Sequence, residues 1–345
     1  MRRRASRRRG AAARRSGNRV PKPITTGMTV VFRVAAGPRL GFGHLVRCRS
    51  LARALGVPAA VSIRGAAATR RLAAALGWTV LPGGPQCLRA MRPAVLVIDD
   101  PSAAAAAPWV RGARRLGITV ASVHDQGVAP VAAQLSVDGS AGRTAACGTH
   151  VRLRGPRFAV LDPGVAEARH RRRPATAAMG VLVALGGGRQ ARQSIVPLVR
   201  HLAAARPDLD IRVAAGFTTP RRPLPAGRFV TAPDGLAREL STALVAVVAG
   251  GVTAYEACAL GVPAVAAAVV PAQAPTIAAL ARAGAVVAAG RLRSGADARR
   301  IAAAALRLLD DGPRRAALRR RGRALVDGRG AARVADAVRR LADAA

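Results

Sequence analysis

Short apolar runs alternate with longer segments of helical periodicity from residue 28 onward. The runs are rich in valine, leucine and alanine, and glycine, proline or aspartate often follows them, as is typical of buried parallel strands. The intervening segments repeat apolar residues every three or four positions, as amphipathic helices do. This order predicts an α/β protein. The expected strands are residues 29–34, 59–63, 78–81, 94–98, 118–123, 135–137, 180–185, 210–215, 229–231, 244–249, 264–270 and 285–289.

The strands and helices divide into two halves joined by a basic linker. Residues 28–165 are expected to form one doubly wound, Rossmann-like domain and residues 178–345 a second, with the linker at 166–177. Residues 1–27 hold nine arginines, one lysine and no acidic residue, and they lack apolar periodicity, so a disordered basic tail is expected there. Two such domains place the carboxyl ends of their strands on either side of a ligand-binding cleft.

The most informative stretch follows the expected strand 244–249. Gly250 and Gly251 end this strand and an alanine-rich helix begins, an arrangement that presents bare backbone N–H groups to a phosphate. Thr253 adds a hydroxyl, and Glu256 lies on the same helix face, where its carboxylate can accept both hydroxyls of a ribose. The stretch therefore predicts a nucleotide site. A structural alternative fits equally well, because Thr253 and Glu256 also have the spacing of a capping box that merely starts the helix.

His44 is the candidate for catalysis in the first domain. It follows Gly41 and Gly43 and opens a helix expected at 45–55. The helix dipole at that end disfavours imidazolium, which predicts a neutral ring able to accept a proton at pH 7. The glycine spacing is not that of a dinucleotide fingerprint. The alternative is a histidine that only caps the helix or packs in the glycine turn.

Acidic residues follow several expected strands of the first domain. Asp99, Asp100, Asp125 and Asp138 each come at or directly after the end of a strand, at the sheet edge that also presents His44. Any one of them could be a helix N-cap. Together they predict a polar edge that faces the cleft.

Charge alone suggests a nucleic-acid partner, but its distribution does not. The formal net charge is +39, and Lys22 is the only lysine, so 55 of the 56 basic residues are arginine. These arginines are scattered over helix faces and lack the interleaved aromatic residues of a single-strand binder. No specific nucleic-acid partner is expected.

Cysteine usage and apolar runs exclude further classes. Cys48, Cys87, Cys147 and Cys258 lack metal-site spacing, which argues against zinc and disulfides and favours reduced thiols in a cytoplasm. No apolar segment follows the first arginines, so a signal peptide is not supported. The uncharged stretch 257–281 is interrupted by glycine and proline, so no membrane span is expected. We expect a monomer without metal or cofactor.

Motifs along the chain resemble a known enzyme family. They are GFGHLVRC at 41–48, with residues 32–33, 51–55, 155–161, 183–187, 250–256, 261–263 and Gln273. Taken in order, these segments resemble the nucleotide-sugar hydrolases of the pseudaminic acid pathway, the UDP-2,4-diacetamido-2,4,6-trideoxy-β-L-altropyranose hydrolases. The resemblance implies a GT-B fold related to the lipid II-forming N-acetylglucosaminyltransferases. It also implies UDP on the second domain, the sugar facing the first, and no metal.

The resemblance also implies roles for individual residues. His44 would be the base that activates water against the anomeric carbon of the sugar. The other roles would be pyrophosphate binding by Thr253 and the amides of Gly250 and Gly251, ribose binding by Glu256, and contact with the sugar or its phosphate by Gln273. We further assign Gly186 and Gly187 to nucleotide binding, and Gly43, Arg47, Asp99, Tyr255 and Gln273 to substrate binding.

The chain departs from this family mainly near the sugar. Val34-Ala35-Ala36 stand where the family usually has an aspartate, Pro101 where it has an aromatic residue, Arg189 where it has Asp, and Ala272 where it has Asn. The nucleotide half is therefore better supported than the identity of the sugar. We expect a hydrolase that releases a free amino- or deoxy-sugar from UDP. The alternatives are a UDP-sugar-dependent glycosyltransferase on the same scaffold and a sugar-nucleotide-binding protein without catalysis.

Overall fold

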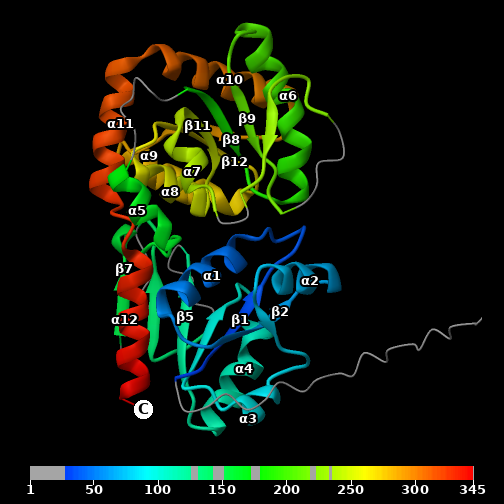
Figure 1. Cartoon of the computed structure of the whole chain (residues 1–345), viewed down its shortest axis with the longest axis vertical. Coiled ribbons are helices and arrows are strands. Elements are labelled where there is room, and N and C mark those ends of the chain that lie inside the picture. Colours follow the sequence, from blue (N-terminus) through cyan, green and yellow to red (C-terminus); the bar gives the residue numbers. More distant parts are fainter. Residues whose placement is uncertain are drawn as a thin grey trace, which may run out of the picture.

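A computed structural model describes residues 28–125, 131–142, 151–171, 179–217, 223–232 and 235–344. Within these residues, two parallel sheets lie in two successive bodies, each sheet with helices on both faces (Figure 1). The predicted α/β class with two Rossmann-like domains is confirmed. The expected tail at 1–27, residues 172–177 of the expected linker, and Cys147 lie outside the described residues.

The described part of the first sheet has seven parallel strands in the order β3-β2-β1-β4-β5-β6-β7. Its strands are β1 (Val30–Ala35), β2 (Ala59–Arg64), β3 (Thr79–Val80), β4 (Val95–Asp99), β5 (Thr119–His124), β6 (Leu135–Asp138) and β7 (Val151–Arg154). Its helices are α1 (Gly43–Leu55), α2 (Ala67–Ala75), α3 (Cys87–Met91) and α4 (Ala103–Arg115). The order reverses between β1 and β4, which is where doubly wound sheets open a crevice for ligands.

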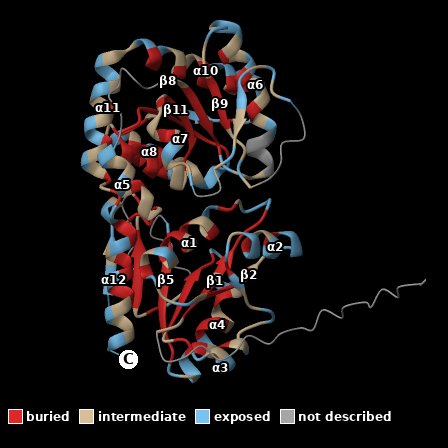
Figure 2. Ribbon diagram, viewed as in Figure 1, coloured by how far each residue is buried: buried red, intermediate tan, exposed pale blue. Residues whose placement is uncertain are grey.

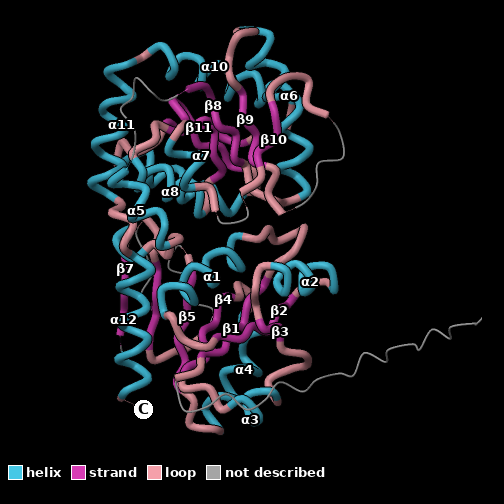
Figure 3. The backbone as a smooth tube through the Cα atoms, in the orientation of Figure 1, coloured by secondary structure: helices cyan, strands magenta, loops and turns pink. Residues whose placement is uncertain are grey.

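The second sheet has the order β10-β9-β8-β11-β12-β13 within the described residues. Its strands are β8 (Met179–Ala184), β9 (Ile211–Ala214), β10 (Arg228–Val230), β11 (Ala243–Ala249), β12 (Ala264–Ala268) and β13 (Val287–Arg291). Its helices are α6 (Arg189–Ala205), α7 (Ala237–Ser241), α8 (Val252–Leu260), α9 (Ala274–Arg282), α10 (Gly295–Asp310) and α11 (Gly312–Leu325), with the short 3-10 turn η3 at Pro271–Gln273. Its switch in order falls between β8 and β11, and the backbone trace in Figure 3 shows this sheet in a body of its own beside that of the first sheet.

The central strands of each sheet are buried because helices cover both faces there, whereas the edge strands β3, β7, β10 and β13 are more exposed (Figure 2). In the first domain, α1 turns Leu45, Cys48, Leu51 and Leu55 onto the sheet, the helical spacing that the sequence shows. Trp109 of α4 packs in the cluster on the opposite face. Packing of the helices holds the strands in place. Because the strands are parallel, the residues that follow them all lie at the same edge of the sheet.

Two segments cross between the domains. The helix α5 (Pro163–Arg171) takes up the first half of the expected linker, and its Val165 belongs to the core of the second domain. The last helix, α12 (Gly330–Asp343), returns to the first domain, where Val334 and Val338 pack in the same cluster as α1 and β1 (Figure 1). A division that gives all of 178–345 to the second domain does not anticipate this return.

None of the described helices is both long and apolar enough to cross a membrane. The uncharged stretch 257–281 instead forms the end of α8, the strand β12 and most of α9. Most of its apolar residues are buried in the cores of the second domain, which explains why this stretch lacks charged residues.

Candidate active site

A cavity of about 1160 Å³ lies between the carboxyl edges of the two sheets. Both domains contribute to its wall, and every residue assigned to the site from the sequence lines it. These residues are Gly43, His44, Arg47 and Asp99 from the first domain, and Gly186, Gly187, Gly250, Gly251, Thr253, Tyr255, Glu256 and Gln273 from the second. Asp100 and Asp125 also line it, whereas Asp138 does not.

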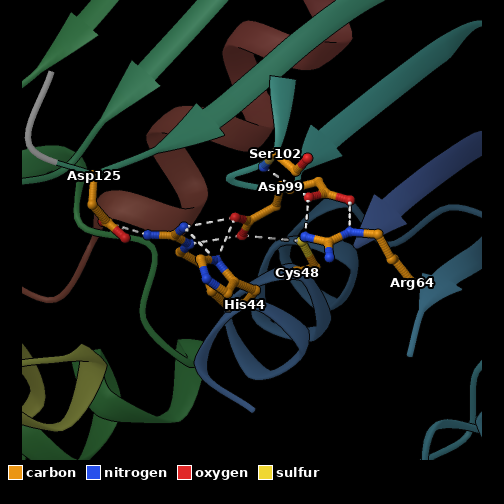
Figure 4. A network of polar contacts seen from close by, with 8 residues as sticks. His44, Cys48, Arg64, Asp99, Ser102 and Asp125 are labelled. Atoms are coloured by element: carbon orange, nitrogen blue, oxygen red, sulfur yellow. Dashed lines mark hydrogen bonds and ion pairs between the residues drawn. The ribbon is translucent and has the colours of Figure 1, made fainter. Parts of the chain in front are cut away.

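His44 lies in the first turn of α1, and its ring is held by Asp99 at the end of β4 (Figure 4). His44 Nδ1 is 2.7 Å from Asp99 Oδ1. An ionised carboxylate only accepts hydrogen bonds, so Nδ1 carries the proton and donates it. The other ring nitrogen, Nε2, therefore keeps its lone pair in the neutral ring and is the atom able to accept a proton.

The expectation that helix position lowers the pKa of His44 is wrong. Burial of the ring does lower its pKa, but the charge of Asp99 and the hydrogen bond to it outweigh burial and raise the pKa above the ordinary 6.5. A nearby ionised carboxylate stabilises imidazolium more strongly than the partial charge of a helix end destabilises it. The ring is therefore a stronger base than the sequence predicts.

Arg47 lies one turn further along α1 and binds the same carboxylate. Its Nε donates to Asp99 Oδ2 at 2.9 Å and its Nη2 to Asp99 Oδ1 at 2.8 Å. Burial alone would raise the pKa of Asp99, but the charges of Arg47 and His44 hold it well below its usual range. Asp99 is thus an ionised, nearly inaccessible partner of His44, and the polar atoms of Arg47 and Asp99 are already engaged with one another.

The start of α8 rules out the capping-box alternative. The helix begins at Val252 with Gly251 as its N-cap, and no side chain caps it. Thr253 is thus already inside the first turn, and the residue lines the cavity. The first N–H groups of a helix have no acceptor within it, so those of Val252 and Thr253 are available at the cavity edge.

The two glycines before α8 have different reasons to be glycine. A Cβ on Gly250 would lie 2.7 Å from the carbonyl oxygen of Gln273 and 2.7 Å from a side-chain carbon of Ile277. A Cβ on Gly251 would meet nothing within 4 Å. Gly250 therefore allows β11 to pack against α9, and only Gly251 leaves open space for a ligand.

Glu256 is a buried carboxyl at the cavity wall, with 4% of the residue exposed. Burial raises its pKa to about 7, and the charge of Asp162 adds to this rise. No hydrogen bond to its carboxyl group is seen among the described residues. A largely buried carboxyl group without a hydrogen-bond partner in the described residues is suited to a ligand that brings its own hydroxyl donors.

Tyr255 and Gln273 line the cavity but already make protein contacts. The Tyr255 hydroxyl accepts a hydrogen bond at 3.0 Å from the backbone N–H of Ala141, so it links the second domain to the first. The Gln273 side-chain oxygen accepts from the backbone N–H groups of Val269 at 2.9 Å and Val270 at 3.3 Å. This leaves the NH2 group of Gln273 as its free polar group.

An aromatic contact at the cavity wall joins the two domains and was not expected from the sequence. Phe42 of the first domain and Phe217 of the second meet edge to face, with ring centroids 5.7 Å apart. A Cβ on Gly187 would lie 3.2 Å from the Phe42 ring, so the absence of a side chain there allows the two domains to approach. Gly186 has a φ of +88°, a conformation that favours glycine. Phe42 stands inside the GFGH motif, whereas nothing in the sequence around Phe217 marks it.

Solved structures share this arrangement of two domains around a cleft. The spinosyn forosaminyltransferase SpnP has 16% sequence identity and a TM-score of 0.66, with 92% of this chain and all of that chain covered. MurG from Acinetobacter baumannii has 16% identity and a TM-score of 0.57, covering 91% and 100% of the two chains. The chain has the GT-B fold.

A third solved structure extends the likeness to epimerases. The UDP-GlcNAc 2-epimerase from Neisseria meningitidis, bound to UDP-GlcNAc, has 9% identity and a TM-score of 0.58, covering 91% of this chain and 100% of that chain. No protein-family model matches the sequence. No curated protein matches it either. At these identities the likeness establishes the GT-B fold, and the chemistry rests on the site. Within the described residues, no group of histidine, cysteine and acidic side chains is arranged to hold a metal ion.

Proposed function

We propose that this protein is a nucleotide-sugar hydrolase that removes UDP from a UDP-linked amino- or deoxy-sugar. The observation that carries the proposal is the 2.7 Å contact between His44 and the buried Asp99 at the cavity wall. It fixes the tautomer in which Nε2 can take a proton from water as the water oxygen bonds to the anomeric carbon. The bond between the anomeric carbon and the diphosphate oxygen of UDP breaks, and its electron pair leaves with UDP.

The second domain supplies the nucleotide-binding half of this reaction. We assign the diphosphate to the free N–H groups at the start of α8 and to the Thr253 hydroxyl, because helix N-termini favour anions. Glu256 takes the ribose hydroxyls, and the NH2 group of Gln273 faces the sugar or its phosphate. Neighbours in fold support a nucleotide ligand, since one is a complex of the rhamnosyltransferase SpnG with thymidine diphosphate and another a complex of S. aureus MnaA with UDP.

The identity of the nucleotide and sugar rests on the motifs described first. The segment around Gly250 to Glu256 and the GFGH motif resemble those of the pseudaminic acid pathway hydrolases. On that resemblance the nucleotide is UDP, and the sugar belongs to surface-polysaccharide or pseudaminic acid biosynthesis.

A glycosyltransferase is the second candidate. Ligand cavities usually span roughly 300–1,000 Å³, and this one, at about 1160 Å³, leaves room for an acceptor beside a nucleotide sugar. An acceptor hydroxyl would then replace water as the group that His44 deprotonates. The third alternative, binding without catalysis, is disfavoured because a buried carboxylate orients the histidine at the cavity.

Incubation with a panel of UDP-sugars in ¹⁸O-labelled water, with and without sugar acceptors, tests the proposal. We expect UDP and a free sugar without added metal, with the label in the sugar. Label in the phosphate would mean attack at phosphorus and would remove the role of His44. Product formed only with an acceptor would establish the transferase instead. The control is His170→Asn, which changes an exposed histidine outside the cavity and should leave turnover unchanged.

A further inference from the structure

Arg47 contacts two carboxylates, Asp99 and Asp125, and Asp99 in turn contacts His44, so the four side chains form one row of polar contacts. Figure 4 shows His44, Asp99 and Asp125 of this row. The row runs from His44 to Asp99, then to Arg47, and ends at Asp125 just after β5. Arg47 Nη1 is 2.5 Å from Asp125 Oδ1. The Arg47 side chain is 9% exposed and that of Asp99 is 2% exposed, whereas Asp125 is 47% exposed at the cavity wall.

Arg47 and Asp125 act on the protonation of His44 in opposite directions. Arg47 Nη2 is 3.3 Å from His44 Nδ1, and since that nitrogen donates to Asp99, the contact brings a positive charge against the ring. The guanidinium therefore opposes a proton on His44 and offsets the charge of Asp99. Asp125 adds a second negative charge, which favours that proton.

Two other titratable side chains near His44, Cys48 and His124, are neutral and add no charge. Cys48 donates to Asp99 Oδ2 at 3.5 Å, and burial holds the pKa of its thiol well above the ordinary value, so it stays neutral. His124, at the end of β5, is kept neutral because burial lowers its pKa. Across the cavity, the titratable residues on the facing wall are Tyr255 and Glu256 of α8 and Arg293, which lies between β13 and α10.

We propose that Arg47 and Asp125 are positioning residues that set the basicity of His44 through Asp99. The paired hydrogen bonds of Arg47 fix the rotation of the Asp99 carboxylate, so that one oxygen meets His44 Nδ1. Asp125 binds the guanidinium on the side opposite Asp99. The positive charge of Arg47 cancels the negative charge of Asp99, and Asp125 makes the net charge beside His44 negative again. This inference rests on the proposed role of His44 as the base.

The titration of His44, followed by NMR of the full chain labelled in histidine, tests this without any substrate. The resonance of His44 is assigned as the one that is missing from the spectrum of the His44→Asn variant. Arg47→Gln should raise the midpoint and Asp125→Asn should lower it, each on the order of 0.5–1 pH unit. The matched control is Arg64→Gln, which breaks a paired contact with Asp100, the neighbour of Asp99, and should shift the midpoint by less than either.

Arg47→Lys separates charge from geometry and also covers the case in which Arg47→Gln does not fold. Lysine keeps the positive charge but cannot hold both carboxylate oxygens. We expect a midpoint near that of the unchanged protein, kcat lower by about 10–100-fold and KM within about twofold. Shifts of the same sign in Arg47→Gln and Asp125→Asn, or undiminished kcat in Arg47→Lys, would overturn the inference. A protein with these shifts but no UDP-sugar turnover would instead refute the proposed function alone.

Discussion

His44 Nδ1 and Asp99 Oδ1 lie 2.7 Å apart, and this contact joins the first turn of α1 to the end of β4. The strands β1 and β4 are neighbours, with Val34 in register with Asp99. The helix that follows β1 therefore delivers its histidine onto the carboxylate that ends β4. This geometry gives the base a fixed tautomer and a raised pKa, from which the first prediction comes.

The acidic limb of the pH profile of kcat/KM should lie above 6.5. The base works when its ring is neutral, and Asp99 raises the pKa of His44, so activity is lost as the pH falls through that raised value. Asp99→Asn should move the midpoint downward and reduce turnover by about 10²–10⁴-fold, because an amide can also hold the opposite tautomer. A limb at or below 6.5 in the unchanged protein would contradict this view of the pair.

Nucleotide affinity should depend on the second domain and turnover on the first. UDP should bind with a micromolar Kd, roughly −7 to −8 kcal/mol. Glu256→Ala should weaken binding by about 1–3 kcal/mol, because hydrogen bonds to the ribose are lost. His44→Asn should leave Kd unchanged and reduce turnover by about 10²–10⁴-fold. Calorimetry with UDP and ADP measures the first effects, and equal affinity for the two nucleotides would speak against the site.

Gly250→Ala and Gly251→Ala form a matched pair with opposite outcomes. A methyl group at 250 would collide with Gln273 and Ile277, so we expect a loss of about 1–3 kcal/mol in the free energy of unfolding. The same group at 251 would enter open space, so stability should fall less than for Gly250→Ala, only through the poorer N-cap, while UDP binding weakens. Denaturant unfolding and calorimetry on both variants measure the two effects. An equal loss in the free energy of unfolding for both variants would show that a side chain at 251 is not tolerated either, and would contradict the open space there.

Glu256 should make the protein less stable as the pH rises. Its pKa is about 7 in the folded protein and 4.5 ordinarily, so the folded state holds the proton more tightly between these values. The free energy of unfolding should then fall by about 3 kcal/mol as the pH rises from 4.5 through 7. Glu256→Gln should remove this part of the slope in urea titrations across the pH range. If Glu256→Gln leaves the pH dependence of the free energy of unfolding unchanged, burial does not raise the pKa of this carboxyl group.

Much of the fold and the membership of the site could be predicted because strand ends are local features. Apolar runs that stop at glycine or aspartate place Gly250 and Asp99 at sheet edges, and both line the cavity. The partner of His44 could not be predicted in this way. Asp99 is 55 positions from His44 in sequence, and only the register of β1 with β4 selects it over Asp100 or Asp125. Side-chain alternation then turns Asp100 away, toward Arg64.

Spacing along the sequence does not by itself locate the first turn of α8, nor does it show which domain receives α12. Thr253 and Glu256 have capping-box spacing, but α8 starts earlier, at Val252, with Gly251 as its N-cap. The apolar stripe of α12 marks which face is buried and not which sheet receives it. Only the assembled structure shows Val334 against the first domain.

The return of α12 to the first domain has a consequence for the order of events during synthesis. The groove beside α1 is completed by Val334 and Val338, and Arg339 donates to the carbonyls of Ala54 and Leu55 at the end of α1. Ribosomes add about 5–20 residues each second, so the first sheet waits on the order of ten seconds for its covering helix. Throughout that interval the nascent chain carries a bare apolar groove, a place where a chaperone can bind or neighbouring chains can associate.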